Sequence, residues 1–342
     1  PELSTAETLL TIPDLFNFWL TGKRFCEFTI ATTTQCFNPT RRDWAWDLLD
    51  ALGIPRRIFP AIIPPGTVLG AVQPAVAKEL GLDPDNPVQV IAPACHDTGS
   101  AAAAIPAETE NFAWISSGTW SVMGTNTDEP VINDQSLQYN FTNEGGVGGK
   151  FRFSKNIMGL WLVQQCRRTW AASGEERSYG ELTEMAAAAK PFASFVDPDD
   201  PSFLQPGDMP SRIRQYCRRT NQVEPEEKGA VVRAALEGIA LKYRWVLERL
   251  EDMTGKRLDP IHIVGGGTQN RLLSQFTADC TRRRVITGPI EATAAGNILT
   301  QALALGHIAS PSEIPAIIHK SFPVDVFEPG DPAGWDEAYQ RL

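Results

Sequence analysis

Hydrophobic residues recur along this chain in two patterns, helical spacings of three or four and short continuous runs. The longest helical pattern covers residues 229–254, and Gly255 follows it as a stop signal. Similar spacings and boundary residues predict further helices at 8–20, 43–52, 71–80, 98–104, 156–172, 270–279 and 292–305. Short apolar runs predict strands at 88–93, 112–116, 120–124, 261–264 and 285–287. Strands that alternate with helices predict an α/β fold with a partly parallel sheet.

Two long stretches give weaker signals. Residues 1–80 are mostly helical in pattern and predict little sheet, with Asp43 as the candidate N-cap of its helix and Gly53 as the stop. Residues 190–228 are rich in Pro, Asp and Arg, and they predict a loop with one short helix. The first part of the chain is therefore expected to contribute few strands.

Composition narrows the class of protein. With 342 residues, 42% of them hydrophobic and 21% charged, the chain is typical of a soluble globular protein of one or two domains. No run of about 18 apolar residues predicts a membrane span, so no membrane partner is expected. The formal net charge of −10 disfavours nucleic acid as a partner. The six cysteines have no metal-ligand or disulfide spacing and indicate reduced thiols, so we expect a cytoplasmic protein.

Candidate chemistry begins at His96, Asp97 and Thr98, where strand 88–93 gives way to a helix. Ligands of open α/β sheets bind at the carboxyl ends of strands, so a carboxylate here is a candidate functional group. Asp97 can be an N-cap that accepts hydrogen bonds from helical amides, or a general base that takes a proton from a hydroxyl. His96 is a candidate contact to a substrate hydroxyl.

A turn at 115–120 is a candidate phosphate site. It contains Gly118 and Thr119, and it offers backbone N–H groups and hydroxyls with no bulky side chain before Trp120. Such a turn can cradle phosphate oxygens. A plain β-hairpin is the structural alternative, because turns of this kind are common.

A second turn contains Gly265, Gly266 and Gly267 and leads to Asn270. It can let a nucleotide approach the N-terminus of the helix that follows. It is no dinucleotide fingerprint, because Asn270 stands where the third glycine belongs. A tight strand-to-helix turn is the alternative.

Two amides in the predicted helix 156–172 are further candidates. Asn156 and Gln164 lie two helical turns apart, so both can face one cleft. Amides on a solvated surface are the commoner case.

Four segments in a fixed order make a more specific pattern than any one of them. They are His-Asp-Thr, Ser-Ser-Gly-Thr-Trp-Ser, Lys-Asn-Ile-Met-Gly-Leu-Trp and Val-Gly-Gly-Gly-Thr-Gln-Asn-Arg-Leu-Leu. In this order the chain resembles the FGGY carbohydrate kinases from about residue 8 to residue 330. Residues 152–162 and 288–297 resemble the rhamnulokinase branch of that family most.

The resemblance implies an actin-like, ribonuclease-H-like pair of α/β domains with the active site in the cleft between them. It implies that residues 1–107 are the later part of a sugar-binding domain and that residues 108–342 form a nucleotide-binding domain. The implied reaction is ATP-dependent phosphorylation of L-rhamnulose to L-rhamnulose 1-phosphate, with Mg²⁺ accompanying ATP. Sugar and ATP are then the small-molecule partners.

The resemblance also assigns roles to single residues. Asp97 matches the catalytic base, and the sugar contacts are His96, Asp97, Thr98 and Asn156. The implied nucleotide contacts are Gly118, Thr119, Gln164, Gly265, Gly266, Gly267 and Asn270. Phosphoryl transfer needs mainly positioning, charge neutralisation and one base aimed at the nucleophile, which agrees with this set. Neither metal ligands nor an oligomeric state can be assigned from the sequence.

The chain departs from the family at its start. The family begins with a β-hairpin that carries an Asp-x-Gly-Thr phosphate motif, and Pro1 matches a point well inside the first domain. We therefore expect an incomplete first domain, part of a longer polypeptide, and no ATP turnover by these residues alone. A xylulose or fuculose kinase, a non-catalytic sugar or nucleotide sensor, and an actin-like assembly protein are the alternatives.

Overall fold

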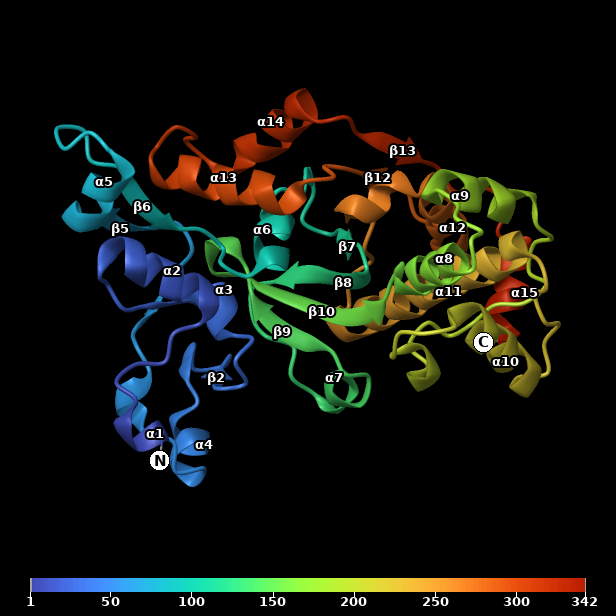
Figure 1. Cartoon of the computed structure of the whole chain (residues 1–342), viewed down its shortest axis with the longest axis horizontal. Coiled ribbons are helices and arrows are strands. Elements are labelled where there is room, and N and C mark those ends of the chain that lie inside the picture. The colour runs from blue at the N-terminus through green and yellow to red at the C-terminus, as the bar shows by residue number, and fades with distance from the viewer. Residues whose placement is uncertain (1, 342) are drawn as a thin grey trace. The chain divides into compact units, whose positions relative to one another are not determined.

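The computed structural model describes residues 2–341 and divides into two compact units (Figure 1). The first unit comprises Pro1–Pro106, Asn126–Phe153 and Ala292–Lys320. The second comprises Ala107–Thr125, Ser154–Glu291 and Ser321–Leu342. The mixture of helices and strands confirms the predicted α/β class.

Short elements make up the first unit. Its helices are α1 (Glu2–Thr5), α2 (Ile12–Thr21), α3 (Phe28–Ala31), α4 (Trp46–Ala51), α5 (Pro74–Leu80), α6 (Asp97–Ala103), α7 (Asp134–Gln138), α13 (Ala292–Ala304) and α14 (Ile314–Ser321). Its strands are β1 (Cys26–Glu27), β2 (Phe37–Asn38), β3 (Asp43–Trp44), β4 (Ile62–Ile63), β5 (Thr67–Ala71), β6 (Gln89–Ala92) and β9 (Thr142–Gly145). An aromatic core, in which Phe28 meets Phe37 and Phe151 edge to face, joins α3 to these strands.

The expectation of little sheet before residue 88 is wrong at β5. This strand pairs antiparallel with β6, with Thr67 opposite Ala92 and Ala71 opposite Gln89. The register shifts between Val68 and Gly70, and Gly70 has a φ of 118°. Such a bulge interrupts the period-two alternation by which a strand is recognised in a sequence.

Asp43 is not the N-cap of α4, so that prediction is wrong. It lies in β3, where its carboxylate accepts hydrogen bonds from the Trp44 backbone N–H (2.7 Å) and the Trp46 indole N–H (3.0 Å). The helix begins at Trp46, and the N-cap position is held by Ala45 without a side-chain hydrogen bond. The Asp43 carboxylate is therefore held by Trp44 and Trp46 and does not cap α4.

Helices α6 and α13 pack closely together at Gly296. A β-carbon on this glycine would lie 1.8 Å from the Ser100 carbonyl oxygen, so only glycine allows the observed approach. The Thr293 hydroxyl also lies 3.4 Å from the Asp97 carbonyl oxygen, at the start of α6. The first turn of α6 is thus held by a helix from much later in the chain.

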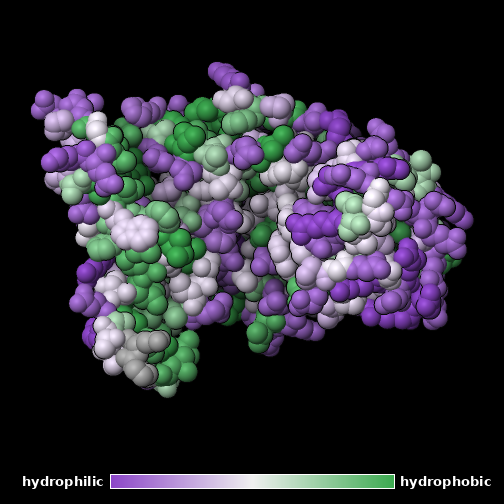
Figure 2. All heavy atoms as spheres, viewed as in Figure 1, coloured by the Kyte–Doolittle hydropathy of each residue, from purple (hydrophilic) through white to green (hydrophobic). Residues whose placement is uncertain are grey.

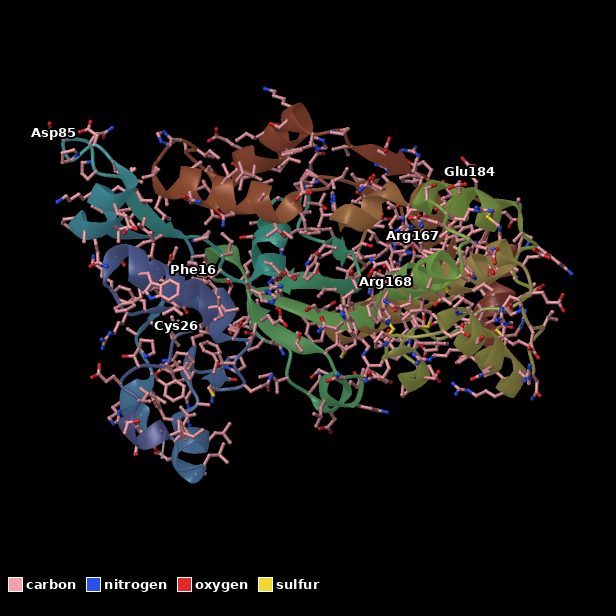
Figure 3. All side chains as sticks on the ribbon, in the orientation of Figure 1. Phe16, Cys26, Asp85, Arg167, Arg168 and Glu184 are labelled. Carbon is pink, nitrogen blue, oxygen red and sulfur yellow. The ribbon has the colours of Figure 1, made fainter. Side chains whose placement is uncertain are left out.

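The outer side of α2 is apolar. Ile12, Phe16 and Trp19 are exposed along this helix, and the Phe16 and Trp19 rings meet edge to face with centroids 5.2 Å apart. Figure 2 shows hydrophobic residues over this part of the first unit, and Figure 3 labels Phe16. These side chains form a surface patch rather than part of the core.

The second unit is built on a sheet with the order β13-β12-β11-β7-β8-β10, beyond which β9 follows. Its strands are β7 (Ala113–Ser117), β8 (Trp120–Thr127), β10 (Phe151–Met158), β11 (Ile261–Val264), β12 (Val285–Thr287) and β13 (Asp325–Phe327). Strand β11 pairs parallel with β7 and β12, whereas β7–β8 and β12–β13 are antiparallel. The predicted partly parallel sheet is confirmed.

Helices surround this sheet in the second unit. They are α8 (Trp161–Ala172), α9 (Tyr179–Ala188), α10 (Met209–Arg219), α11 (Lys228–Thr254), α12 (Arg271–Thr281) and α15 (Ala333–Arg341). The predicted long helix 229–254 is confirmed as α11, which ends where Gly255 adopts a φ of 65°. Residues 190–228 are mostly loop, as predicted, with α10 as the one complete α-helix and a short 3-10 helix at Pro201–Phe203.

The predicted helix 156–172 is wrong in its first third. Residues 151–158 form strand β10, and α8 begins only at Trp161. The apolar residues Phe151, Phe153 and Ile157 share odd-numbered positions, as on one face of a strand, although the even-numbered Arg152, Ser154 and Met158 are buried as well. The helical pattern of α8 follows so closely that the two signals merge in the sequence.

Candidate active site

Asp97 is the first residue of α6, five positions after strand β6 ends. The N-cap position belongs to His96, so the N-cap interpretation of Asp97 is wrong. Its Oδ1 atom accepts hydrogen bonds from the Thr98 backbone N–H (2.5 Å) and the Thr98 hydroxyl (3.1 Å). The carboxylate is 79% exposed. It can therefore receive a proton from a molecule that arrives from solvent.

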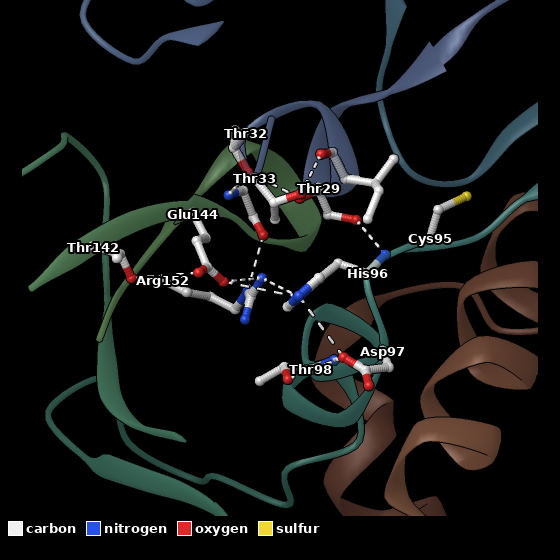
Figure 4. A network of polar contacts seen from close by, with 12 residues as sticks. Thr29, Thr32, Thr33, Cys95, His96, Asp97, Thr98, Thr142, Glu144 and Arg152 are labelled. Carbon is white, nitrogen blue, oxygen red and sulfur yellow. Dashed lines mark hydrogen bonds and ion pairs between the residues drawn. The ribbon is translucent and has the colours of Figure 1, made fainter. Parts of the chain in front are cut away.

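His96 lies between this carboxylate and a buried ion pair (Figure 4). Its Nε2 atom is 3.8 Å from Asp97 Oδ1, and its Nδ1 atom is 2.9 Å from Arg152 Nη2. Glu144 Oε2 is 3.8 Å from Nδ1 and 3.0 Å from Arg152 Nη2. Burial in the first place, and then the Arg152 charge, lower the pKa of His96.

Arg152 and Glu144 are functional candidates that the sequence analysis did not assign. Arg152 comes from β10 and is 1% exposed, and its Nε–H donates to the Gly145 carbonyl oxygen at 2.9 Å. Glu144 comes from β9. A charged residue between Phe151 and Phe153 in an apolar strand was the available signal, because such a residue is rarely buried without a partner.

Glu27 fixes the backbone that leads to His96. It is fully buried, and its carboxylate accepts hydrogen bonds from the N–H groups of Thr29 (2.9 Å), Ile30 (3.3 Å) and Cys95 (3.0 Å). The Thr29 hydroxyl donates to Glu27 and accepts from the His96 N–H at 3.0 Å. Helix α3 is thereby tied to the segment that carries His96 and Asp97.

The protonation of Glu27 is expected to make stability depend on pH. Burial raises its pKa from 4.5 to about 7, so the folded chain holds this proton over a range in which the unfolded chain has released it. Between these values the folded state binds more protons, and the free energy of unfolding falls as pH rises. The loss is at most about 3 kcal/mol. Urea unfolding at a series of pH values is expected to show a flatter profile for E27Q than for the wild type, and parallel profiles would contradict this.

Thr98 and Asn156, both predicted sugar contacts, lie in different units of the structure. Thr98 is buried in the first turn of α6, in contact with Asp97. Asn156 is an exposed residue of β10 within the second unit, not of a helix, so the predicted helical pairing with Gln164 is wrong. The structure thus brings His96, Asp97 and Thr98 together, and the role of Asn156 stays a prediction.

Gly118, Thr119 and Gln164 are brought together in the second unit. Gly118 and Thr119 connect β7 and β8, so the hairpin alternative describes this turn correctly. Their carbonyl oxygens accept hydrogen bonds from the Leu160 (3.0 Å) and Trp161 (3.1 Å) N–H groups at the start of α8. The Thr119 hydroxyl donates to Gln164 Oε1 at 3.1 Å. The hairpin turn and the first turns of α8 therefore form one polar surface.

The glycine turn at 265–267 packs directly on this hairpin. Gly265 has a φ of 90°, and a β-carbon there would lie 2.8 Å from the Ser117 carbonyl oxygen. A β-carbon on Gly267 would lie 2.0 Å from Ser117 Oγ, whereas one on Gly266 would meet nothing within 4 Å. Asn270 caps α12 by accepting from the Leu273 N–H at 3.0 Å. The bare backbone at Gly266 fits the close approach of a nucleotide.

A buried pair of hydroxyl groups connects the β7–β8 hairpin to α11. Tyr243, on α11, places its hydroxyl 2.6 Å from Ser121 Oγ on β8. Burial raises the pKa of Tyr243 to about 12. This pair was not found in the sequence, because Tyr243 fits the apolar stripe of its helix.

Two negative findings apply to residues 2–341. Over that range, no group of three or more His, Cys, Asp or Glu side chains is arranged to hold a metal ion. Mg²⁺ that accompanies a nucleotide is bound largely by phosphates and water, so it does not require such a group. Within the same range no helix is long and apolar enough to cross a membrane.

Comparison with known proteins identifies the class. The N-terminal domain of the FGGY family of carbohydrate kinases matches residues 2–104, and the C-terminal domain matches residues 113–305. The chain belongs to the FGGY family, which confirms the resemblance seen in its motifs.

Individual relatives of this chain belong to one branch of the family. The chain is 43% identical to a rhamnulokinase from Bacteroides thetaiotaomicron, over 98% of this chain and 68% of the relative. It is 41% identical to a rhamnulokinase from Halalkalibacterium halodurans, over 95% of this chain and 68% of the relative.

Solved structures confirm the expected two-domain kinase fold. A ligand-bound xylulose kinase from Lactobacillus acidophilus superposes with a TM-score of 0.76 at 20% identity, covering 98% of this chain and 67% of that one. Plasmodium falciparum glycerol kinase with ADP gives a TM-score of 0.73 at 17% identity, covering 97% and 66%. The fold is therefore shared with sugar kinases whose sequences have diverged widely.

Proposed function

We propose that the protein carrying this chain is an ATP-dependent kinase that phosphorylates L-rhamnulose on its carbon-1 hydroxyl. Relatives between 36% and 43% identical over nearly the whole chain are rhamnulokinases. The observation that carries the chemical part is the exposed Asp97 carboxylate at the start of α6, with His96 beside it. All six cysteines are free thiols, which fits a location in the cytoplasm.

The proposed step needs one proton acceptor. The sugar oxygen attacks the γ-phosphorus of ATP, a new O–P bond forms, and the bond to the bridging oxygen of ADP breaks. Asp97 takes the proton that the attacking hydroxyl loses. A metal ion that accompanies ATP would neutralise charge on the transferring phosphoryl group, and the residues of the chain would contribute mainly orientation.

The sugar contacts of this proposal lie around the base. His96 and Thr98 flank Asp97 in the sequence, and His96 is held by buried partners that leave its Nε2 side toward the carboxylate. Asn156 is proposed as a further sugar contact. Hydrogen-bonding groups of this kind select between ketoses, because a site that loses one partner leaves its own polar groups unpaired.

The nucleotide contacts of this proposal lie in the second unit. Thr119 and the Gly118 backbone are proposed to hold phosphate oxygens, with Gln164 beside them. Gly265, Gly266 and Gly267 are proposed to border the adenosine, with Asn270 as the cap of the helix behind them. Support comes from the packing of Gly265 and Gly267 on Ser117, which directly precedes Gly118 in the chain, so the two turns lie side by side.

An ATP-coupled assay of the complete natural polypeptide tests this function. L-rhamnulose, L-fuculose and D-xylulose are supplied separately, and ADP release is followed for each. We expect the highest kcat/KM for L-rhamnulose and one phosphate per sugar, on carbon 1. A preference for another ketose would contradict the substrate while leaving the kinase class intact, and no turnover with any ketose would contradict the kinase.

A further inference from the structure

The environment of His96 is more constrained than a sugar contact requires. Its Nδ1 atom lies 2.9 Å from Nη2 of Arg152, a side chain that is almost fully buried (Figure 4). Both residues belong to the first unit. The contact is therefore part of one compact body and is independent of any substrate.

The chemistry of this contact fixes which of the two groups donates the hydrogen bond, and hence the tautomer of His96. A guanidinium group carries only donors and stays protonated in proteins. The Nδ1 atom of His96 must therefore accept, which requires a lone pair there and places the single proton of the ring on Nε2. A doubly protonated imidazole would set an N–H group against the guanidinium N–H at the same distance.

Three charged groups face the ring, and they come from three different elements. Arg152 comes from β10, Glu144 from β9 lies 3.8 Å from Nδ1, and Asp97 from α6 lies 3.8 Å from Nε2. The two carboxylates favour a protonated ring, and burial and Arg152 oppose it. The pKa of His96 is lowered on balance, so Arg152 and burial outweigh both carboxylates.

The guanidinium is held in place by partners other than His96. Its Nε–H donates to the Gly145 carbonyl oxygen at 2.9 Å, and Nη2 meets Glu144 Oε2 at 3.0 Å. Its own pKa is lowered, first by burial. Arg152 thus presents a fixed donor to the ring, and it cannot turn away without breaking a buried ion pair.

We propose that Arg152 is a positioning residue that keeps His96 neutral with its proton on Nε2, so that His96 offers only a hydrogen-bond donor beside Asp97. The role in catalysis rests on the proposed function of Asp97. His96 then donates to a sugar oxygen while Asp97 accepts the proton, and the two cannot exchange tasks. A positive charge on His96, 3.8 Å from the carboxylate, would make Asp97 a poorer proton acceptor.

Nitrogen NMR of the histidine rings tests the assignment directly. The sequence contains only four histidines, and the signals lost in H96Q identify those of His96. In the wild type we expect an unprotonated Nδ1, a protonated Nε2, and a pKa below the ordinary value of 6.5. In R152Q we expect the pKa of His96 to rise, because burial alone then opposes Glu144 and Asp97.

A second variant, E144Q, tests the proposal if R152Q does not fold. E144Q removes a carboxylate that favours the charged ring, so the pKa of His96 is expected to fall further, with the proton still on Nε2. R283Q serves as the matched control, because Arg283 is also a largely buried arginine paired with a glutamate, Glu251, in the second unit. It is expected to leave the His96 signals unchanged. A proton on Nδ1 in the wild type, or an unchanged pKa in folded R152Q, would overturn the proposal.

Kinetics test the catalytic half separately. If protonated His96 weakens the base, the loss of kcat/KM at low pH is expected to begin at a higher pH in R152Q than in the wild type. An unmoved acid limb, together with a raised pKa of His96 by NMR, would overturn the link to catalysis. The NMR results do not require turnover. A protein inactive on every ketose would therefore refute the proposed function, while NMR would still determine the protonation state of His96.

Discussion

Replacing Asp97 with asparagine is expected to lower kcat for sugar phosphorylation by about 10²–10⁴-fold, the usual contribution of a general base. The amide keeps an oxygen that can accept from the Thr98 N–H, but it cannot take up a proton. Because the carboxylate is exposed and the amide oxygen can still accept from Thr98, the fold and the free energy of unfolding are expected to stay close to wild type. The measurement is kcat with saturating ATP and L-rhamnulose, alongside a urea unfolding curve.

A matched control separates the base from a simple loss of charge. Asp134 is likewise an exposed aspartate at the first residue of a helix, α7, in the same unit. D134N is expected to retain wild-type kcat. If D97N retains it as well, the proton acceptor is another group. If D97N loses turnover but binds sugar and ATP as before, the sensor alternative is excluded, because a sensor does not turn over its ligand.

Replacing Gly267 with alanine is expected to destabilise the second unit by about 1–3 kcal/mol, as overpacking does in well-packed cores. The added β-carbon would lie 2.0 Å from Ser117 Oγ and 2.7 Å from Ser117 Cβ, so β7 or the turn has to move. The same movement displaces the hairpin that carries Thr119. We therefore expect a higher KM for ATP as well, measured with the unfolding curve.

Gly266 is the matched control for this variant. A β-carbon there meets no atom within 4 Å, so G266A is expected to leave the free energy of unfolding unchanged. If a nucleotide approaches this open backbone, G266A is expected to raise the KM for ATP without lowering the free energy of unfolding. Equal stabilities of the two variants would contradict the packing argument, and an unchanged KM in G266A would contradict the nucleotide assignment.

Elements with a strong repeating pattern were predictable from the sequence. The long helix α11 and the unit of β11, glycine turn and α12 were found within one or two residues of their observed bounds. Their apolar periods are uninterrupted, and glycine follows both α11 and β11. Strand β10 was missed because its period-two pattern runs into the helical pattern of α8. Strand β5 was missed because a bulge at Gly70 breaks its alternation.

The candidate site was only half visible in the sequence. His96, Asp97 and Thr98 are adjacent along the chain, so one motif predicts their proximity. Arg152 and Glu144 approach them only through the pairing of strands, and Glu27 approaches from another direction through α3. Contacts between residues this distant along the chain depend on tertiary packing, which local propensity and spacing do not encode.

The close fit of Gly296 against Ser100 has a consequence for how this protein is made. Helix α6 leaves the ribosome long before α13, since about two hundred residues separate them. Domains emerge N-terminal end first and fold as units, so the first unit stays open on one side while the whole of α11 is synthesised. A nascent chain stopped before α13 would carry Asp97 on a helix that lacks its packing against α13. The proposed proton acceptor is thus synthesised early, and its helix gains the packing against α13 late.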